Sequence, residues 1–284
     1  IYIIIPLIVI PQMILGGAMF KFENLNKSIG GGHHIPVVSN LMVSRWAYEG
    51  IMVAQFSNNK YEKNVFDYEQ LLSDYNYRTS YLYPYLTDLL NDQLSDNKDE
   101  SLKCSDTVYN TLVFEASKLM VKNVLEFDLN DHSIQTSMQF IEDLSTLYQD
   151  KYNELSRKKD AKIMEMDRSL GENALMNLKR SYHNDNVADI VQNALSKKKF
   201  FVENSMVYQN YDHIFLRDHL KPDYKIDGTF MYVPIKSFFG NKISTFWYNI
   251  LVIWFFIFVL FIVLYFDGLK KLLDIQIFKK KSFS

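Results

Sequence analysis

The chain has a single cysteine, Cys104, among its 284 residues. One cysteine excludes an internal disulfide and any zinc site that needs several thiolates. A catalytic thiol would also need a histidine partner, and the sequence indicates none. We therefore expect Cys104 to act as a small buried apolar side chain.

Neither sign of charge is in excess. Lysine and arginine total 31 and aspartate and glutamate 33, which gives a formal net charge of −2. The chain lacks the excess of lysine and arginine that nucleic-acid-binding domains show, so no nucleic-acid partner is predicted. The mean hydropathy of −0.13 averages two apolar ends and a polar middle.

Familiar catalytic and cofactor motifs are missing: there is no HExxH, no Rossmann fingerprint and no Ser/His/Asp grouping. Gly30 to Gly32 lack the Gly-Lys-Ser/Thr ending of a phosphate-binding loop, so they predict a turn. His33 and His34, and the pair His213 and His219, have no partners at metal-ligand spacing. Solvated or locally hydrogen-bonded histidines are the better interpretation. We predict no catalytic, cofactor-binding or metal-ligating residue in this chain.

One long uncharged run is present, from Phe246 to Phe266. As a helix, 21 residues would rise about 32 Å, which matches a hydrocarbon core of about 30 Å. Asn249 is its one strongly polar residue, while Trp247 and Tyr265 lie near its ends, where amphipathic rings favour the headgroup region. The run therefore predicts a transmembrane helix.

Lysines cluster after this run, at Lys270, Lys271 and 279–281. Because lysines near a span stay preferentially in the cytoplasm, we expect a cytoplasmic C-terminus and an extracytoplasmic region before the span. This places the protein in a membrane.

The N-terminal run, residues 1–20, is also uncharged, but Pro6, Pro11, Gly16 and Gly17 interrupt it. Such a run predicts the end of a transmembrane helix followed by a turn or re-entrant piece; an ordinary kinked span is the alternative. Its first residue is already apolar and no basic region precedes it, so we expect no signal peptide and a chain that continues upstream.

Residues 36–56 predict one helix. Arg45 and Glu49 are four residues apart and are expected to face each other on its surface. Trp46 and Tyr48 fit a position at the membrane surface. The helix is then either an interfacial helix with one ion pair or a gate that lines a transport path.

The polar middle of the chain predicts an α-helical domain. Apolar residues recur at helical spacing, with a predicted loop at 92–101 and a predicted break at Gly171. Helices are expected near 66–75, 112–127, 140–166, 173–182 and 187–200. The fold class is therefore a mainly α membrane protein, divided into residues 1–57 (broken membrane segment and interfacial helix), 58–233 (helical extracytoplasmic insert) and 234–284 (last transmembrane helix and cytoplasmic tail).

Three stretches resemble G-subfamily, ABC-2-type ATP-binding cassette transporters. Residues 11–18, PQMILGGA, resemble the outer end of the fifth transmembrane helix of that family, and residues 44–50, SRWAYEG, resemble the external loop that follows it. Residues 234–240, PIKSFFG, with 245–249, TFWYN, and 264–267, LYFD, resemble the return to the sixth and last helix in large bacterial members. The resemblance covers about a third of the chain.

The resemblance implies the permease portion of an ATP-driven exporter. It implies an upstream ATP-binding domain that uses ATP and Mg²⁺, contact with membrane lipid, and a homo- or heterodimer of transporter halves around an unknown substrate. Pro11 and Gln12 would help to form the outer end of the path, and Arg45 and Glu49 would gate or brace it. The insert at 58–232 is much longer than the family's usual external loop, so its role is not implied.

A second hypothesis is a bitopic sensor or an envelope interaction protein with a helical domain for a ligand or partner. The tail of eighteen residues after Phe266 leaves no room for a signalling domain, which counts against the sensor.

Overall fold

A computed structural model describes residues 4–19, 22, 35–97, 105–120, 133–171, 173–194, 196–216, 230–238 and 240–266. The chain is mostly helical and forms two compact units. Unit 1 comprises Ile1–Ala54 and Asp223–Ser284, and unit 2 comprises Gln55–Pro222. The sequence-based boundaries, 57/58 and 233/234, differ from this division mainly at the second border.

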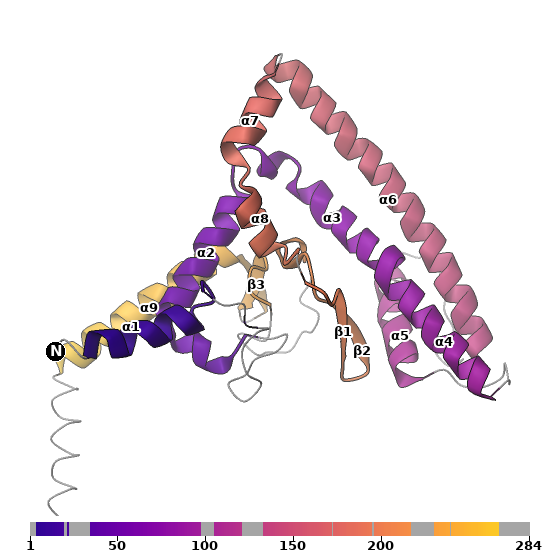
Figure 1. The fold of residues 1–284 in the computed structure, drawn as a ribbon, viewed down its shortest axis with the longest axis horizontal. Helices are drawn as coiled ribbons and strands as arrows, with labels where there is room; N and C mark the ends of the chain where they lie inside the picture. Colours follow the sequence, from indigo (N-terminus) through magenta and orange to yellow (C-terminus); the bar gives the residue numbers. More distant parts are fainter. Residues whose placement is uncertain are drawn as a thin grey trace, which may run out of the picture. The chain divides into compact units, whose positions relative to one another are not determined.

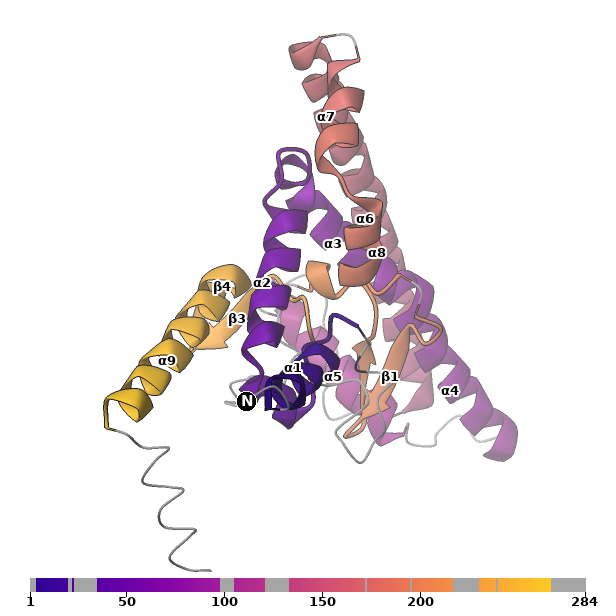
Figure 2. The same ribbon diagram turned by 60° about the vertical axis from the view of Figure 1, so that its left-hand side comes forward.

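Unit 1 contains the two apolar ends of the chain (Figures 1 and 2). Its elements are α1 (Ile4–Leu15), the 3-10 turn η3 (Val37–Leu41), α2 (Val43–Ser57) up to Ala54, β3 (Ile235–Phe238), β4 (Asn241–Ser244) and α9 (Thr245–Tyr265). The prediction of one helix over 36–56 is wrong at its start. Met42 has an extended backbone, with φ −90° and ψ 110°, which separates η3 from α2.

Helix α9 is long and apolar enough to cross a membrane, as predicted. It is 21 residues long, and buried side chains occur only in its first turn, at Thr245, Tyr248 and Asn249. Its remaining side chains are largely exposed and apolar, which is how a helix that faces lipid differs from a helix in a soluble core. In the described part of the chain, α9 is the one helix that meets this length criterion.

Helix α1 is shorter, at 12 residues, and contains Pro11. It ends at Leu15 and is followed by Gly17 with φ +77°, at the predicted turn. The left-handed backbone there favours glycine, because other residues pay a steric cost at positive φ.

The strands β3 and β4 form an antiparallel hairpin that the sequence did not predict (Figure 2). Ile235 pairs with Ser244 at the open end, and Phe238 pairs with Asn241 near the turn. The Thr245 amide donates a hydrogen bond to the Pro234 carbonyl at 3.0 Å, which closes the open end. The hairpin therefore leads directly into the first turn of α9.

Unit 2 is built around helices α3, α4 and α6, with α6 alongside the other two (Figure 1). Its elements are η4 (Glu62–Asn64), α3 (Phe66–Tyr77), the π-helical turn η5 (Arg78–Leu82), α4 (Tyr83–Asn97), α5 (Asp106–Met120), α6 (Ile134–Leu170), α7 (Ala174–Tyr182), α8 (Asp185–Val191), β1 (Phe200–Glu203), β2 (Met206–Gln209) and η6 (His213–Phe215).

Several helix boundaries differ from the prediction. The helix predicted near 66–75 continues beyond its predicted end, because a π turn carries the chain from α3 into α4; the Tyr83 amide donates to the Arg78 carbonyl, five residues back. Helix α4 then extends to Asn97, into the predicted loop 92–101. The helix predicted for 187–200 stops at Val191.

Asn193, with φ 52°, follows the end of α8, and the end of the predicted range belongs to the hairpin β1–β2. Asn204 and Ser205 both have positive φ, 49° and 54°, between the two strands. A two-residue turn with both residues left-handed matches the twist of the strands it joins. The sequence signal was weak, since Asn-Ser is a poorer marker of this turn than Asn-Gly.

The predicted long helix is confirmed as α6. The Ser133 hydroxyl caps it by accepting from the Thr136 amide, and Gly171, with φ +89°, ends it. The Asn184 side chain caps α8 by accepting from the Val187 amide. These ends follow the usual chemistry of helix caps.

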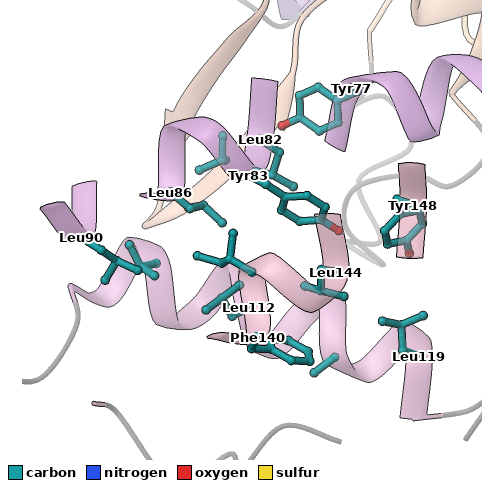
Figure 3. Packing of buried hydrophobic residues seen from close by; sticks show 14 of the residues in the cluster. Tyr77, Leu82, Tyr83, Leu86, Leu90, Leu112, Leu119, Phe140, Leu144 and Tyr148 are labelled. Atoms are coloured by element: carbon teal, nitrogen blue, oxygen red, sulfur yellow. The ribbon is translucent and has the colours of Figure 1, made fainter. Parts of the chain in front are cut away.

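The core of unit 2 lies where α4, α5 and α6 meet (Figure 3). Leucines four residues apart, Leu82, Leu86 and Leu90, line one face of the helical run, because positions four apart share a helix face. Leu112 of α5 and Leu144 of α6 are fully buried against the same cluster. Unit 2 therefore has its own hydrophobic core.

Candidate functional site

A cluster of buried charged side chains lies in unit 1, centred on α2. Arg45 and Glu49 are one helical turn apart, with Nη2 and Oε2 separated by 3.6 Å. The predicted pair is thus confirmed, but the prediction that it lies on the helix surface is wrong. Both side chains are 0% exposed.

Two other segments of unit 1 reach this pair. Lys236 of β3 donates a hydrogen bond from Nζ to Glu49 Oε2 at 2.7 Å. Asn249 of α9 donates from Nδ2 to the same oxygen at 3.0 Å, and also to the Trp46 carbonyl at 2.9 Å. Lys236 is 3% exposed and Asn249 1%. The polar residue of the apolar run is therefore bonded to α2.

We call Arg45, Glu49, Lys236 and Asn249 the charge cluster. It contains two cations and one carboxylate. Burial alone would raise the pKa of Glu49, but the charges of Lys236 and then Arg45 outweigh it and lower that pKa below its ordinary value. Glu49 is consequently ionised at neutral pH, and the charge cluster has a net positive charge.

Aromatic rings cover the two cations. The Lys236 ammonium lies 4.7 Å from the centroid of the Trp46 ring and 5.3 Å from that of Tyr248. The Arg45 guanidinium lies 3.9 Å from the Trp46 centroid. Rings at these distances attract cations through their negative faces and partly replace the lost water. Trp46 is 2% exposed, so its ring packs inside unit 1.

Pro11 and Gln12 lie in α1. The Gln12 backbone carbonyl accepts a hydrogen bond from the Ser44 hydroxyl at 2.9 Å, so α1 contacts α2 one residue before Arg45. Pro11, which has no amide hydrogen, interrupts the hydrogen bonding of α1. Three of the four candidate positions, Gln12, Arg45 and Glu49, therefore take part in one continuous set of contacts.

Sequence reasoning missed Lys236 and Asn249 as members of this set. The sequence did contain a sign of the role of Asn249, because a polar side chain within an apolar helix usually faces other parts of the protein and bonds to them. Lys236 carried no such sign, because a single lysine before an apolar run forms no pattern of its own. The arrangement has no nucleophile or acid–base pair open to a substrate, so its chemistry is the electrostatic joining of α2, β3 and α9.

The remaining sequence candidates contribute less. Cys104, Gly30 to Gly32, His33, His34 and His219 lie outside the described residues. His213 lies in η6 and is buried, which excludes the solvated alternative for this histidine and leaves the locally hydrogen-bonded one. Among the described residues, no group of three or more His, Cys, Asp or Glu side chains is placed to hold a metal ion.

Comparison with models of known families, with curated proteins and with solved structures finds no match.

Gly50→Ala is expected to stabilise unit 1 by about 0.5–1 kcal/mol, because glycine in a helix interior costs about that much relative to alanine. The new Cβ would lie 3.5 Å from Asn249 Cβ, an ordinary contact. Gly17→Ala is the contrasting variant: its backbone has φ +77° and the new Cβ would lie 2.9 Å from Met231 Sδ. The melting temperature of the full chain in detergent should rise for Gly50→Ala and fall for Gly17→Ala; a fall for Gly50→Ala contradicts the packing described here.

Proposed function

We propose that this chain is the permease portion of an ATP-driven ABC-2-type exporter. The supporting observation is that the segments resembling this family are mutually bonded. Residues 44–50 supply Arg45 and Glu49, residues 234–240 supply Lys236, and residues 245–249 supply Asn249. The carbonyl of Gln12, from residues 11–18, bonds to Ser44.

In this proposal the charge cluster couples α2 to α9, so that the two helices move as one. The first turn of α9 and the hairpin that precedes it are bonded to a single carboxylate on α2. A shift of α9 that separates Asn249 and Lys236 from Glu49 leaves buried charges unpaired, which is costly. Helix α2 and α9 are therefore expected to move together when the transporter changes state, with Pro11 and Gln12 near the outer end of the path.

The proposal includes a location and partners. The protein is integral to the bacterial inner membrane, α9 crosses lipid, the insert at 58–233 is extracytoplasmic and the C-terminus is cytoplasmic. A second transporter half completes the path for a substrate that is still to be identified. ATP and Mg²⁺ belong to the ATP-binding domain implied upstream, and no residue of this chain is assigned to them. ATP shifts the equilibrium only by binding one state better than the other.

The test is ATP hydrolysis in lipid vesicles by the full-length protein, which is this chain together with the ATP-binding domain implied upstream. The comparison is the same protein from which residues 1–284 are deleted. We expect hydrolysis that depends on this region and that falls at least tenfold in Glu49→Gln. The matched control is Glu165→Gln, an exposed glutamate that pairs with Lys162. No hydrolysis by a folded full-length chain overturns the exporter proposal.

The alternative, a sensor or envelope interaction protein, is favoured by one observation. Unit 2 is compact and has its own core, as an independent ligand- or partner-binding domain would. A folded protein that does not hydrolyse ATP would favour this alternative.

A further inference from the structure

Residues 4–19 and 35–44 of unit 1, which contain α1 and η3, have their polar side chains inside and their apolar side chains outside. Among the side chains described there, every exposed one is apolar. In η3, Val37 is 82% exposed and Leu41 68%, whereas Ser39 between them is fully buried. The surface of a domain in water mixes polar and apolar groups, so this distribution indicates contact with lipid or with another protein.

The polar groups of these segments bond to one another and to α2. The Ser44 hydroxyl donates to the Gln12 carbonyl at 2.9 Å. Asn40 accepts twice: its side-chain oxygen accepts from Arg45 Nη1 at 3.0 Å, and its carbonyl accepts from Trp46 Nε1 at 2.9 Å. A segment that faces lipid needs this inward bonding, because hydrocarbon offers polar groups no partner. Lipid therefore suits this surface better than a protein partner, which would offer polar groups of its own.

The backbone of η3 indicates how deep it can lie. The Ser39 amide donates to the Pro36 carbonyl at 2.9 Å, and the Met42 amide donates to the Ser39 carbonyl at 3.0 Å. A turn of five residues is too short to pair all of its backbone groups internally. It therefore fits the boundary between headgroups and hydrocarbon, where water is still available, and not the centre of a bilayer.

Hydrogen bonds also place η3 beside the start of α9. Trp46 connects them, because its ring donates to the Asn40 carbonyl of η3 and its own carbonyl accepts from Asn249 of α9. Asn249 belongs to the beginning of α9, which starts at Thr245. The turn η3 is thus joined through one residue to the end of the apolar helix, and the end of a span lies at a membrane surface.

We propose that η3 is an interfacial lipid anchor, in which Val37, Val38 and Leu41 insert at the boundary between headgroups and hydrocarbon, level with the first turn of α9. The partner is the hydrocarbon of one leaflet, because all three side chains are aliphatic and no exposed residue of 35–44 is charged. The anchor holds the start of α2 at a fixed depth in the membrane. This inference rests on the proposal that α9 crosses lipid and does not depend on ATP or transport.

The test is nitroxide labelling of the full chain in phosphatidylcholine vesicles, at single cysteines in a Cys104→Ser background. Val37→Cys and Leu41→Cys report on η3. Oxygen concentrates in hydrocarbon and a nickel chelate stays in water, so the ratio of their collision rates with the label measures depth. We expect a ratio at least about threefold higher than at Met176→Cys, because the polar chelate is excluded from hydrocarbon. Met176 is the matched control, an apolar residue of α7 in unit 2 that is 66% exposed.

Trp247→Cys and Phe258→Cys calibrate the depth, since these residues are exposed at the first turn and in the middle of α9. The ratio at Leu41 should lie within about twofold of that at Trp247 and below that at Phe258, because interfacial segments lie only about 5–10 Å into the boundary. Ratios at both η3 positions equal to that at Met176 would show exposure to water and overturn the proposal. Slow collisions with both reagents would show cover by protein and overturn it too.

The label at Phe258 separates this inference from the proposed function. A high ratio at Phe258 together with a low ratio at Val37 and Leu41 overturns the lipid anchor and leaves the exporter proposal standing. Low ratios at all three positions would show that α9 does not cross lipid, which overturns both proposals.

Discussion

Glu115→Ala is expected to lower the unfolding free energy of unit 2 by about 3–5 kcal/mol, the usual cost of removing one partner of a buried ion pair. The Glu115 carboxylate accepts from Arg78 Nε at 2.6 Å and from Nη2 at 3.2 Å, a two-pronged contact. It also accepts from the Tyr83 hydroxyl at 3.1 Å. The variant leaves the buried guanidinium of Arg78 with Asp74 as its remaining carboxylate partner.

Native-state hydrogen exchange of the α5 amides in the full chain measures this cost. Glu165→Ala is the control, and its cost should stay below about 0.5 kcal/mol because the ion pair it breaks is exposed. Arg78→Met combined with Glu115→Leu should recover at least half of the loss, since apolar side chains often replace a buried ion pair without penalty. A cost for Glu115→Ala no larger than that of Glu165→Ala would contradict this account.

Glu49→Ala is expected to destabilise unit 1 by a similar amount, about 3–5 kcal/mol, because it leaves buried charges without their counter-ion. Glu49 is the one carboxylate of the charge cluster, and Arg45, Lys236 and Asn249 all approach its Oε2. Lys236→Met should cost less, since Glu49 then keeps Arg45 as a partner and methionine fills much of the space. The informative result is that Glu49→Ala destabilises unit 1 more than Lys236→Met does.

Hydrogen exchange of the β3–β4 amides in lipid nanodiscs reports this effect, because Lys236 joins the hairpin to α2. Lys242→Gln is the matched control: this lysine is exposed on β4 of the same hairpin, and its change should cost less than about 0.5 kcal/mol. If Lys236→Met were more harmful than Glu49→Ala, Glu49 would not be the centre of the charge cluster.

Much of the helical structure could be read from local patterns. The composition and length of 246–266 predicted α9, and apolar spacing with the Gly171 break predicted α6 and its end. The four-residue spacing of Arg45 and Glu49 predicted their pairing. In each case the decisive interactions lie within a few residues along the chain, so periodicity, helix caps and hydropathy carry the information.

Short or irregular elements were missed. Each strand of the two hairpins has four residues, too few for an alternating pattern to stand out from its surroundings. The π turn at Arg78–Leu82 has no sequence signature of its own, so the continuation of α3 into α4 was not predicted.

The environment of the charge cluster followed from packing over long sequence distances. Glu49 and Lys236 are 187 residues apart, and Glu49 and Asn249 are 200 apart. Local spacing placed Arg45 beside Glu49 and predicted a solvated surface pair, because it contains no information about what covers a helix face. β3, α9 and the aromatic rings bury that pair in a low-dielectric environment. The loss of any one partner there costs folding free energy, because it leaves a buried charge unpaired. The residue types and their helices thus come from local sequence, and the strength of their interaction comes from the fold that excludes water around them.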